Sequence, residues 1–152
     1  MAEENAVAQQ FCTFYLDGLF FGVEVEKVQE VIRYQAMTRV PRAPEVIGGL
    51  INLRGQIVTA VDLRNRLEMT ARATERKPMN VVVRTEDGAV SLLVDEIGDV
   101  VEVLPNTFEA PPETLAGAAR KLTSGVYKLE GHLLHALDLG AVLQLDTVRQ
   151  LN

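Results

Sequence analysis

The chain has 152 residues, of which 47% are hydrophobic and 24% charged, and its formal net charge is -6. This composition is typical of one folded domain that buries a core without disulfides or metals, and no apolar run approaches the about 20 residues of a membrane helix. The acidic balance excludes general nucleic-acid binding, which requires a basic surface. Basic residues predominate in 28–77 and acidic residues in 78–119, an asymmetry that suits recognition of protein partners.

The N-terminal residues predict a cytoplasmic protein. Residues 1–10 are acidic and polar and lack the basic start and apolar core of a secretory signal. We expect residues 1–8 to form a flexible N-terminus. The single cysteine, Cys12, cannot form an internal disulfide, and its apolar surroundings favour a small core residue over a nucleophile.

Two β-hairpins are predicted in the first half of the chain. The first joins 9–16 to 19–25 at Asp17-Gly18, and a brief helical turn at 26–29 and an extended stretch to Tyr34 follow. The second joins two apolar runs, 50–53 and 57–61, at Arg54-Gly55, where glycine tolerates the positive φ of a tight turn. We therefore expect Arg54 at the rim of a sheet.

A short helix and a connector close the first half. Asp62 is a suitable N-cap for a helix over 62–68. Residues 70–77 are polar and charged and precede Pro78, a composition typical of a connector.

The second half repeats the pattern of the first. Strands are predicted at 79–85 and 89–94. Residues 94–101 align with 25–32, and 128–145 align with 52–69. We interpret this as an ancient duplication in which each copy, with about five short strands and a terminal helix, closes as a small barrel. The expected repeats are 9–69 and 78–145, with strand exchange between the barrels left open.

Two further segments are predicted from composition and periodicity. Residues 104–115 contain three prolines and indicate a long surface loop. A helix over 138–151 would place four apolar residues on one side. We expect this side to pack against the barrels, while exposure to a partner is the alternative; the four residues are Leu139, Val142, Leu143 and Val148.

The sequence contains none of the residue patterns that indicate enzymatic catalysis, a cofactor or a metal site. His132 and His135 are the only histidines, and their spacing on a strand directs them to opposite faces. Gly48-Gly49 lacks the P-loop and dinucleotide patterns. The acidic residues from 95 to 102 lack the spacing of a calcium loop. We conclude that the chain binds partners and is not an enzyme.

Residues 27–34 (KVQEVIRY) and 40–64 (VPRAPEVIGGLINLRGQIVTAVDLR) resemble the CheW coupling proteins of bacterial chemotaxis. The likeness extends to residues 93–100 and to the final Leu-Asp-Leu-Gly helix start, so that 9–152 is expected to be a single CheW-like domain. The resemblance implies a mostly β fold of two SH3-like five-stranded barrels with short helices, one of them C-terminal. It also implies a non-enzymatic adaptor.

The resemblance further implies two partners. One is the cytoplasmic signalling tip of methyl-accepting chemoreceptors, which would lie in an apolar groove between the barrels. The other is the regulatory domain of a CheA-type histidine kinase, which would dock barrel to barrel. The partner-binding residues implied by the motifs are Val28, Glu30, Arg54, Gly55 and Val58. We expect no cofactor, no nucleic acid, no direct membrane insertion, and a monomer in isolation.

Two alternatives remain open at this stage. Glu30 and Arg54 would either contact partners directly or pair with each other across the seam between the barrels. A rival function is a double barrel that binds or converts a small anionic molecule in the inter-barrel cleft, with Arg54 gripping it. The second-half turn carries Glu130 where the first carries Arg54, so only one copy has the basic turn.

Overall fold

The turns predicted from Asp-Gly and Arg-Gly pairs form as tight hairpins in the computed structural model, which describes residues 8–73 and 75–145. Asp17 and Gly18 have φ of 49° and 79°, and Arg54 and Gly55 have φ of 50° and 89°. Positive φ at both central residues is the geometry that matches the twist of two antiparallel strands. The flexible N-terminus was predicted for residues 1–8, and residues 1–7 lie outside the part of the chain that the structure describes.

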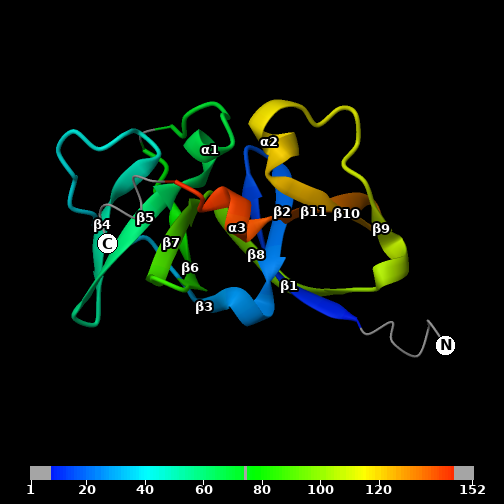
Figure 1. Ribbon diagram of the computed structural model, residues 1–152, viewed down its shortest axis with the longest axis horizontal. Helices are drawn as coiled ribbons and strands as arrows, with labels where there is room; N and C mark the ends of the chain where they lie inside the picture. Colours follow the sequence, from blue (N-terminus) through cyan, green and yellow to red (C-terminus); the bar gives the residue numbers. More distant parts are fainter. Residues whose placement is uncertain (1–7, 74, 146–152) are drawn as a thin grey trace.

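Eleven strands are assigned within the described part of the chain, and they form two sheets that lie side by side (Figure 1). The six-stranded sheet has the order β8-β1-β2-β11-β10-β9. Its strands are β1 (Gln9–Leu16), β2 (Leu19–Glu24), β8 (Glu96–Val103), β9 (Phe108–Glu109), β10 (Thr123–Leu129) and β11 (His132–Leu137). The five-stranded sheet has the order β3-β6-β7-β5-β4. Its strands are β3 (Val28–Ile32), β4 (Ile47–Leu53), β5 (Gln56–Asp62), β6 (Met79–Thr85) and β7 (Gly88–Val94). The mostly β fold is therefore confirmed.

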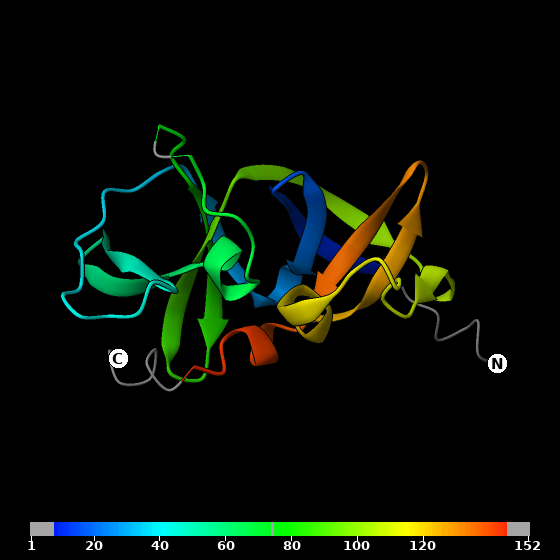
Figure 2. The same cartoon turned by 90° about the horizontal axis from the view of Figure 1, so that it is seen from above.

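The two halves of the chain exchange their first hairpins. Strands β1 and β2 join the sheet of the second half, and β6 and β7 join the sheet of the first half. The sheets therefore do not coincide with the contiguous repeats 9–69 and 78–145. The exchange that the sequence analysis left open is the arrangement observed. Figure 2 shows the hairpin β1–β2 beside β11, on the side of its sheet that faces the other sheet.

The strand register repeats in the two sheets. Phe14 of β1 lies opposite Ile97 of β8, as Val83 of β6 lies opposite Val28 of β3. The parallel contacts repeat as well, because β11 pairs with β2 and β5 pairs with β7 in equivalent positions. Equivalent pairing throughout is the structural counterpart of the duplication seen in the sequence.

Both sheets curl strongly. Strands β8 and β9 occupy opposite edges of the six-stranded sheet, so in a flat sheet they would lie about 24 Å apart. Only Leu104 to Thr107 separate them, and the five steps from Val103 to Phe108 span at most about 18 Å. In the other sheet, the chain beyond β3 crosses to the far edge in the same way, where Thr38 pairs with Leu50 of β4.

The main hydrophobic core lies between the sheets and belongs to both. Phe14, Phe21 and Val23 from one sheet pack in the same cluster as Val61 and Leu92 from the other. Much of the seam between the sheets is thus filled by the chain's own side chains. The core continues under the helices through Leu63, Leu115, Ala119, Leu122, Leu139 and Val142.

The helices are short, and some predicted elements differ in extent. α1 (Leu63–Arg66) and α3 (Leu139–Val142) begin after the N-caps Asp62 and Asp138, whose side chains accept backbone N–H groups. The helix predicted over 138–151 ends at Val142. The part of that prediction that covers 146–151, including Val148, lies outside the described residues. A brief helical turn, η2 (Val25–Lys27), precedes β3.

The loop predicted over 104–115 contains the turn η3 (Pro105–Thr107) and strand β9, and Leu115 at its end is buried. It is followed by α2 (Gly117–Lys121), which was not predicted. Cys12 is half-buried instead of fully enclosed in the core, and burial raises the pKa of its thiol.

A buried ionic cluster ties the two sheets together at one end of the seam. Asp95, between β7 and β8, accepts a hydrogen bond from Arg64 Nε of α1 at 2.8 Å and from the backbone N–H of Asp17 at 2.8 Å. Arg72 Nη2, from the connector after α1, lies 3.0 Å from the same carboxylate. Burial alone would raise the pKa of Asp95, but the hydrogen bonds from Arg64 and Asp17 hold it below its usual value.

The first prediction concerns this cluster. Asp95→Asn removes the carboxylate with which the guanidinium groups of Arg64 and Arg72 both pair. Because these two cations would then be left without an opposite charge in a largely buried place, we expect the free energy of unfolding to fall by about 3 kcal/mol. Urea unfolding at pH 7 measures the loss. Glu96→Gln is the matched control, because Glu96 pairs with Arg76 at the exposed surface and should change stability by less than about 1 kcal/mol.

The same comparison has a defined pH dependence. A carboxyl whose pKa is lower in the folded chain stabilises the fold above its unfolded pKa of about 3.9, and this contribution is lost as the pH falls through the folded pKa. The stability difference between the wild type and Asp95→Asn should therefore be constant above about pH 5 and narrow below about pH 4. A difference that stays constant to lower pH would contradict the assignment.

Candidate functional site

Arg54 projects from the tip of the β4–β5 hairpin. Its side chain is 72% exposed, and Gly55 beside it donates its backbone N–H to Asn52 Oδ1 at 2.9 Å, which closes the turn. Ile57, the second residue of β5, is 63% exposed. The turn therefore presents one cation and one large apolar side chain to the surroundings.

Arg54 forms an ion pair with Glu30 of β3. Strands β3 and β4 are the two edges of one sheet, so the pair bridges the edges of the curled five-stranded sheet. The pairing that the sequence analysis left open is thus present, but its predicted location across the inter-barrel seam was wrong. The hydrogen bonds from Arg54 and Gln29 hold the pKa of Glu30 below its usual value.

The five predicted site residues divide into an exposed group and a supporting group. Arg54 and Gly55 are exposed, and Glu30 is half-buried beside them. Val28 is half-buried against the main core. Val58 is only 3% exposed and packs with Ile51, Leu53 and Val82. Its side chain belongs to the core of the curled sheet and does not reach the surface.

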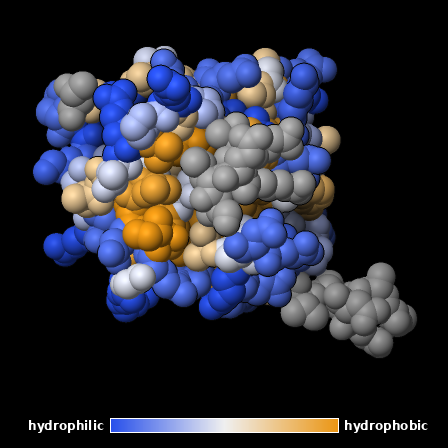
Figure 3. All heavy atoms as spheres, turned by 60° about the vertical axis from the view of Figure 1, so that its left-hand side comes forward, coloured by the Kyte–Doolittle hydropathy of each residue, from blue (hydrophilic) through white to orange (hydrophobic). Residues whose placement is uncertain are grey.

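Apolar residues are exposed near the ion pair. Viewed from the side of the five-stranded sheet, the surface shows a hydrophobic patch framed by hydrophilic residues (Figure 3). Large hydrophobic residues exposed in this sheet and the segment after it include Val31, Tyr34 and Ile57. The Nζ of Lys77 lies 5.0 Å from the centre of the Tyr34 ring. Apolar area bordered by charge is the composition of a protein-binding surface.

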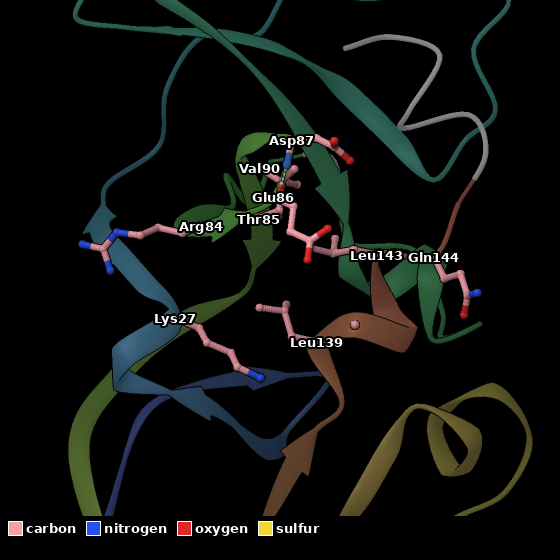
Figure 4. Close-up of a pocket in the computed structure, with 10 residues that line it drawn as sticks. Lys27, Arg84, Thr85, Glu86, Asp87, Val90, Leu139, Leu143 and Gln144 are labelled. Atoms are coloured by element: carbon pink, nitrogen blue, oxygen red, sulfur yellow. Dashed lines mark hydrogen bonds between the residues drawn. The ribbon is translucent and has the colours of Figure 1, made fainter.

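A pocket of about 790 Å³ opens at the seam between the two sheets. The five-stranded sheet contributes the β6–β7 turn and η2, and α3 forms the opposite wall (Figure 4). Leu139 and the Glu86 carboxylate point into the pocket, whereas Arg84 points away from it. We call this feature the seam pocket; its lining is Lys27, Arg84, Thr85, Glu86, Asp87, Val90, Leu139, Gly140, Leu143 and Gln144.

No single sequence motif marks the seam pocket. The signal that pointed to it was the alignment of 52–69 with 128–145, which places Gly140 at the position of Arg64. A glycine in place of a long side chain leaves space, but only the strand exchange brings α3 against the β6–β7 turn. Periodicity and motifs within one segment carry no information on that contact.

The two histidines lie on opposite sides of their strand, as predicted. The His132 ring packs against Phe20 and the His135 ring against Phe21, which are successive residues of β2. Among residues 8–73 and 75–145, no group of three or more His, Cys, Asp or Glu side chains is arranged to hold a metal ion. No helix in the same ranges is long and apolar enough to cross a membrane.

The second prediction tests whether the Arg54–Glu30 pair supports the fold. Exposed ion pairs contribute about 0–1 kcal/mol, so Arg54→Ala should change the free energy of unfolding by less than about 1 kcal/mol. Circular dichroism during urea unfolding measures this value. A loss several times larger would mean that the pair is needed to hold the sheet edges together.

Comparisons with known proteins agree on one family. The family model described as a CheW-like domain matches residues 10–147. The "Chemotaxis protein CheW" of Bacillus subtilis is 29% identical over 97% of this chain and 94% of its own length. "Protein FrzA" of Myxococcus xanthus is 30% identical over 99% of this chain and 97% of its own length.

A solved structure gives the same result. The crystal structure of the scaffolding protein TtCheW from Thermoanaerobacter tengcongensis superimposes with a TM-score of 0.80 and 25% sequence identity. The match covers 93% of this chain and 96% of the other.

Proposed function

The chain belongs to the CheW-like domain family, and from this premise we propose that it joins the signalling tip of methyl-accepting chemoreceptors to the regulatory domain of a CheA-type histidine kinase. At the coarser level it is a chemotaxis coupling adaptor and not an enzyme. We further propose that it acts in the cytoplasm, recruited to receptor arrays at the inner face of the membrane, and that it is a monomer in isolation.

The observation that carries the proposal is the charged and apolar surface around Arg54. An exposed cation, the carboxylate that pairs with it from the opposite sheet edge and the exposed side chain of Ile57 lie around the β4–β5 turn. Charges at the rim of an interface set orientation and specificity, and central apolar side chains supply affinity. This surface suits the barrel-to-barrel contact proposed for the kinase regulatory domain.

The seam pocket is our candidate for the receptor contact. Its apolar wall, formed by Val90, Leu139 and Leu143, would accept apolar side chains of a helical tip, as grooves for amphipathic helices do. The receptor groove implied by the sequence resemblance lies between the barrels. Because core side chains fill much of that seam, we restrict the contact to this pocket and its margins.

The rival small-molecule function is not favoured. In that function, Arg54 would bind an anion inside the inter-barrel cleft. However, Arg54 lies on the β4–β5 turn and does not line the seam pocket. Glu86 and Asp87 line the pocket, and their negative charges disfavour an anionic ligand there.

The experiment that tests the proposal is a reconstitution with purified parts. A soluble fragment containing a receptor signalling tip and a CheA-type kinase should show stimulated kinase autophosphorylation only when this chain is added. Pull-downs with the tip and with the kinase regulatory domain identify which contact forms. Capture of neither partner would refute the proposed function.

The third prediction concerns Arg54 in this assay. Arg54→Ala should retain the fold but lose most of the kinase stimulation, by about tenfold or more, because arginine is enriched among the interface residues whose truncation costs about 2 kcal/mol or more of binding. Arg39→Ala is the control, because Arg39 is also an exposed arginine but lies outside the turn. If Arg54→Ala and Arg39→Ala stimulate the kinase equally, Arg54 is not part of the interface.

The fourth prediction separates direct contact from internal pairing. Glu30→Arg combined with Arg54→Glu keeps an ion pair but reverses its ends. If both residues contact the kinase directly, the double variant remains as defective as Arg54→Ala. Recovery of stimulation in the double variant would show that the pair acts only by bridging the sheet edges.

A further inference from the structure

The seam pocket has an internal counterpart in the same molecule. The alignment of the two halves places Leu139, Gly140 and Leu143 of α3 and its end at the positions of Leu63, Arg64 and Leu67. The equivalent pairing of β2 and β7 with their parallel neighbours places Glu86 at the position of Asp17. The seam pocket and the Arg64–Asp95 cluster are therefore the same site in the two copies.

In one copy, the site is filled by an arginine of the chain itself. The side chain of Arg64 is 9% exposed, with Asp95 at 2.8 Å from its Nε and Asp17 Oδ1 at 3.9 Å from Nη1. Its Nη1 also donates to the Thr70 carbonyl at 2.9 Å. The neighbouring apolar residue, Leu67, is buried. Two acidic residues and an apolar wall thus enclose one guanidinium group.

In the other copy, one acidic residue remains at the site and the arginine is missing. Glu86 takes the place of Asp17, and Gly140 takes the place of Arg64. Glu26, at the position of Asp95, is exposed and does not line the seam pocket. The Glu86 carboxylate points into the pocket (Figure 4) and has no ion pair or side-chain hydrogen bond with the residues described. Leu143, the counterpart of buried Leu67, is only half-buried.

The cations at the margin of the pocket already have partners. Lys27 Nζ lies 3.4 Å from Glu24 Oε1. Arg84 points away from the pocket, and its Nη1 donates to the carbonyls of Glu26 and Val28 at 3.2 and 3.3 Å. Of the two carboxylates that line the pocket, those of Glu86 and Asp87, the Glu86 carboxylate is the one that points toward Leu139 (Figure 4).

From this geometry we propose that the seam pocket binds an arginine side chain of the protein partner, which takes the place that Arg64 occupies in the other copy. Its aliphatic stem packs on Leu139, Leu143 and Val90, and its guanidinium group donates to Glu86. Arginine suits this role because its planar fork forms bidentate hydrogen bonds with a carboxylate and its stem is apolar. The inference rests on the proposed function only in naming the receptor tip as the protein that supplies the arginine.

The decisive variant restores the missing side chain. A Cβ at Gly140 would meet only Asp138 Oδ1 at 3.5 Å, and Gly140 has no positive φ, so both Gly140→Arg and Gly140→Ala fit within α3. Gly140→Arg should fill the pocket and lower affinity for a receptor signalling-tip fragment by about tenfold or more. Gly140→Ala is the size control, because it adds a single methyl group and should lower the affinity far less than Gly140→Arg.

A second measurement does not depend on the receptor. Blocked leucine–arginine–leucine, leucine–glutamine–leucine and leucine–glutamate–leucine tripeptides are titrated into the ¹⁵N-labelled chain, with amide shifts of Glu86, Gly140 and Leu143 as the readout. The arginine peptide should give saturable shifts that Gly140→Arg abolishes and Glu86→Gln weakens. Equal shifts with all three peptides, or larger shifts with the glutamate peptide, would overturn the proposal.

The two measurements separate the possible failures. If the tip fragment does not bind the wild type but the arginine peptide does, the receptor assignment fails and the arginine pocket stands. If the tip binds Gly140→Arg as tightly as Gly140→Ala, the tip places no arginine in the pocket and the proposal fails for the receptor; if the peptides also give equal shifts, the arginine pocket itself fails. Thermal unfolding of each variant confirms that a loss of binding is not a loss of fold.

Discussion

The exchange of hairpins between the two halves is the constraint on which the rest of the structure depends. Neither sheet forms from one half of the chain, because each takes its central hairpin from the other half. The core residues of β1 and β2 therefore pack in one cluster with those of β5, β6 and β7. Long-range pairing of this kind makes the two sheets one cooperative unit and carries a high entropic cost during folding.

The exchange also explains why the two ends of the seam differ in function. It brings α1 to the junction at one end and α3 to the junction at the other. Arg64 and Asp95 close the first end with a buried ion pair, which is stabilising only while both partners are present. Gly140 leaves the second end open. After the duplication, one copy of the site holds the sheets together while its counterpart is free to bind.

The surface around Arg54 shows a similar division between the copies. Arg54 pairs with Glu30 across the edges of its curled sheet, whereas the equivalent positions in the second copy, Glu130 and Asp99, are both acidic. Like charges cannot form such a bridge. A single basic turn on a molecule with two similar sheets gives a partner one orientation in which to dock, and this is what a coupling protein between two different partners needs.

The sequence by itself determined the local features. Asp17-Gly18 and Arg54-Gly55 specified their turns, Asp62 and Asp138 specified two helix starts, and the alignment of 25–32 and 52–69 with 94–101 and 128–145 revealed the duplication. The motif around Arg54 also identified the family and the exposed part of the candidate site. These features depend on residues that are near one another in the chain, so they can be predicted from the chemistry of short sequence segments.

Only the tertiary structure decided which half supplies each hairpin, where Glu30 meets Arg54, and that Val58 is buried. Val58, Thr59, Ala60 and Val61 are consecutive in β5 and all buried, because the curled sheet covers one face of the strand and the second sheet covers the other. The end of α3 at Val142 and the seam pocket likewise depend on contacts between distant segments. Hydrophobic burial is non-directional, so a periodic pattern shows that a face is covered but not which distant strand covers it.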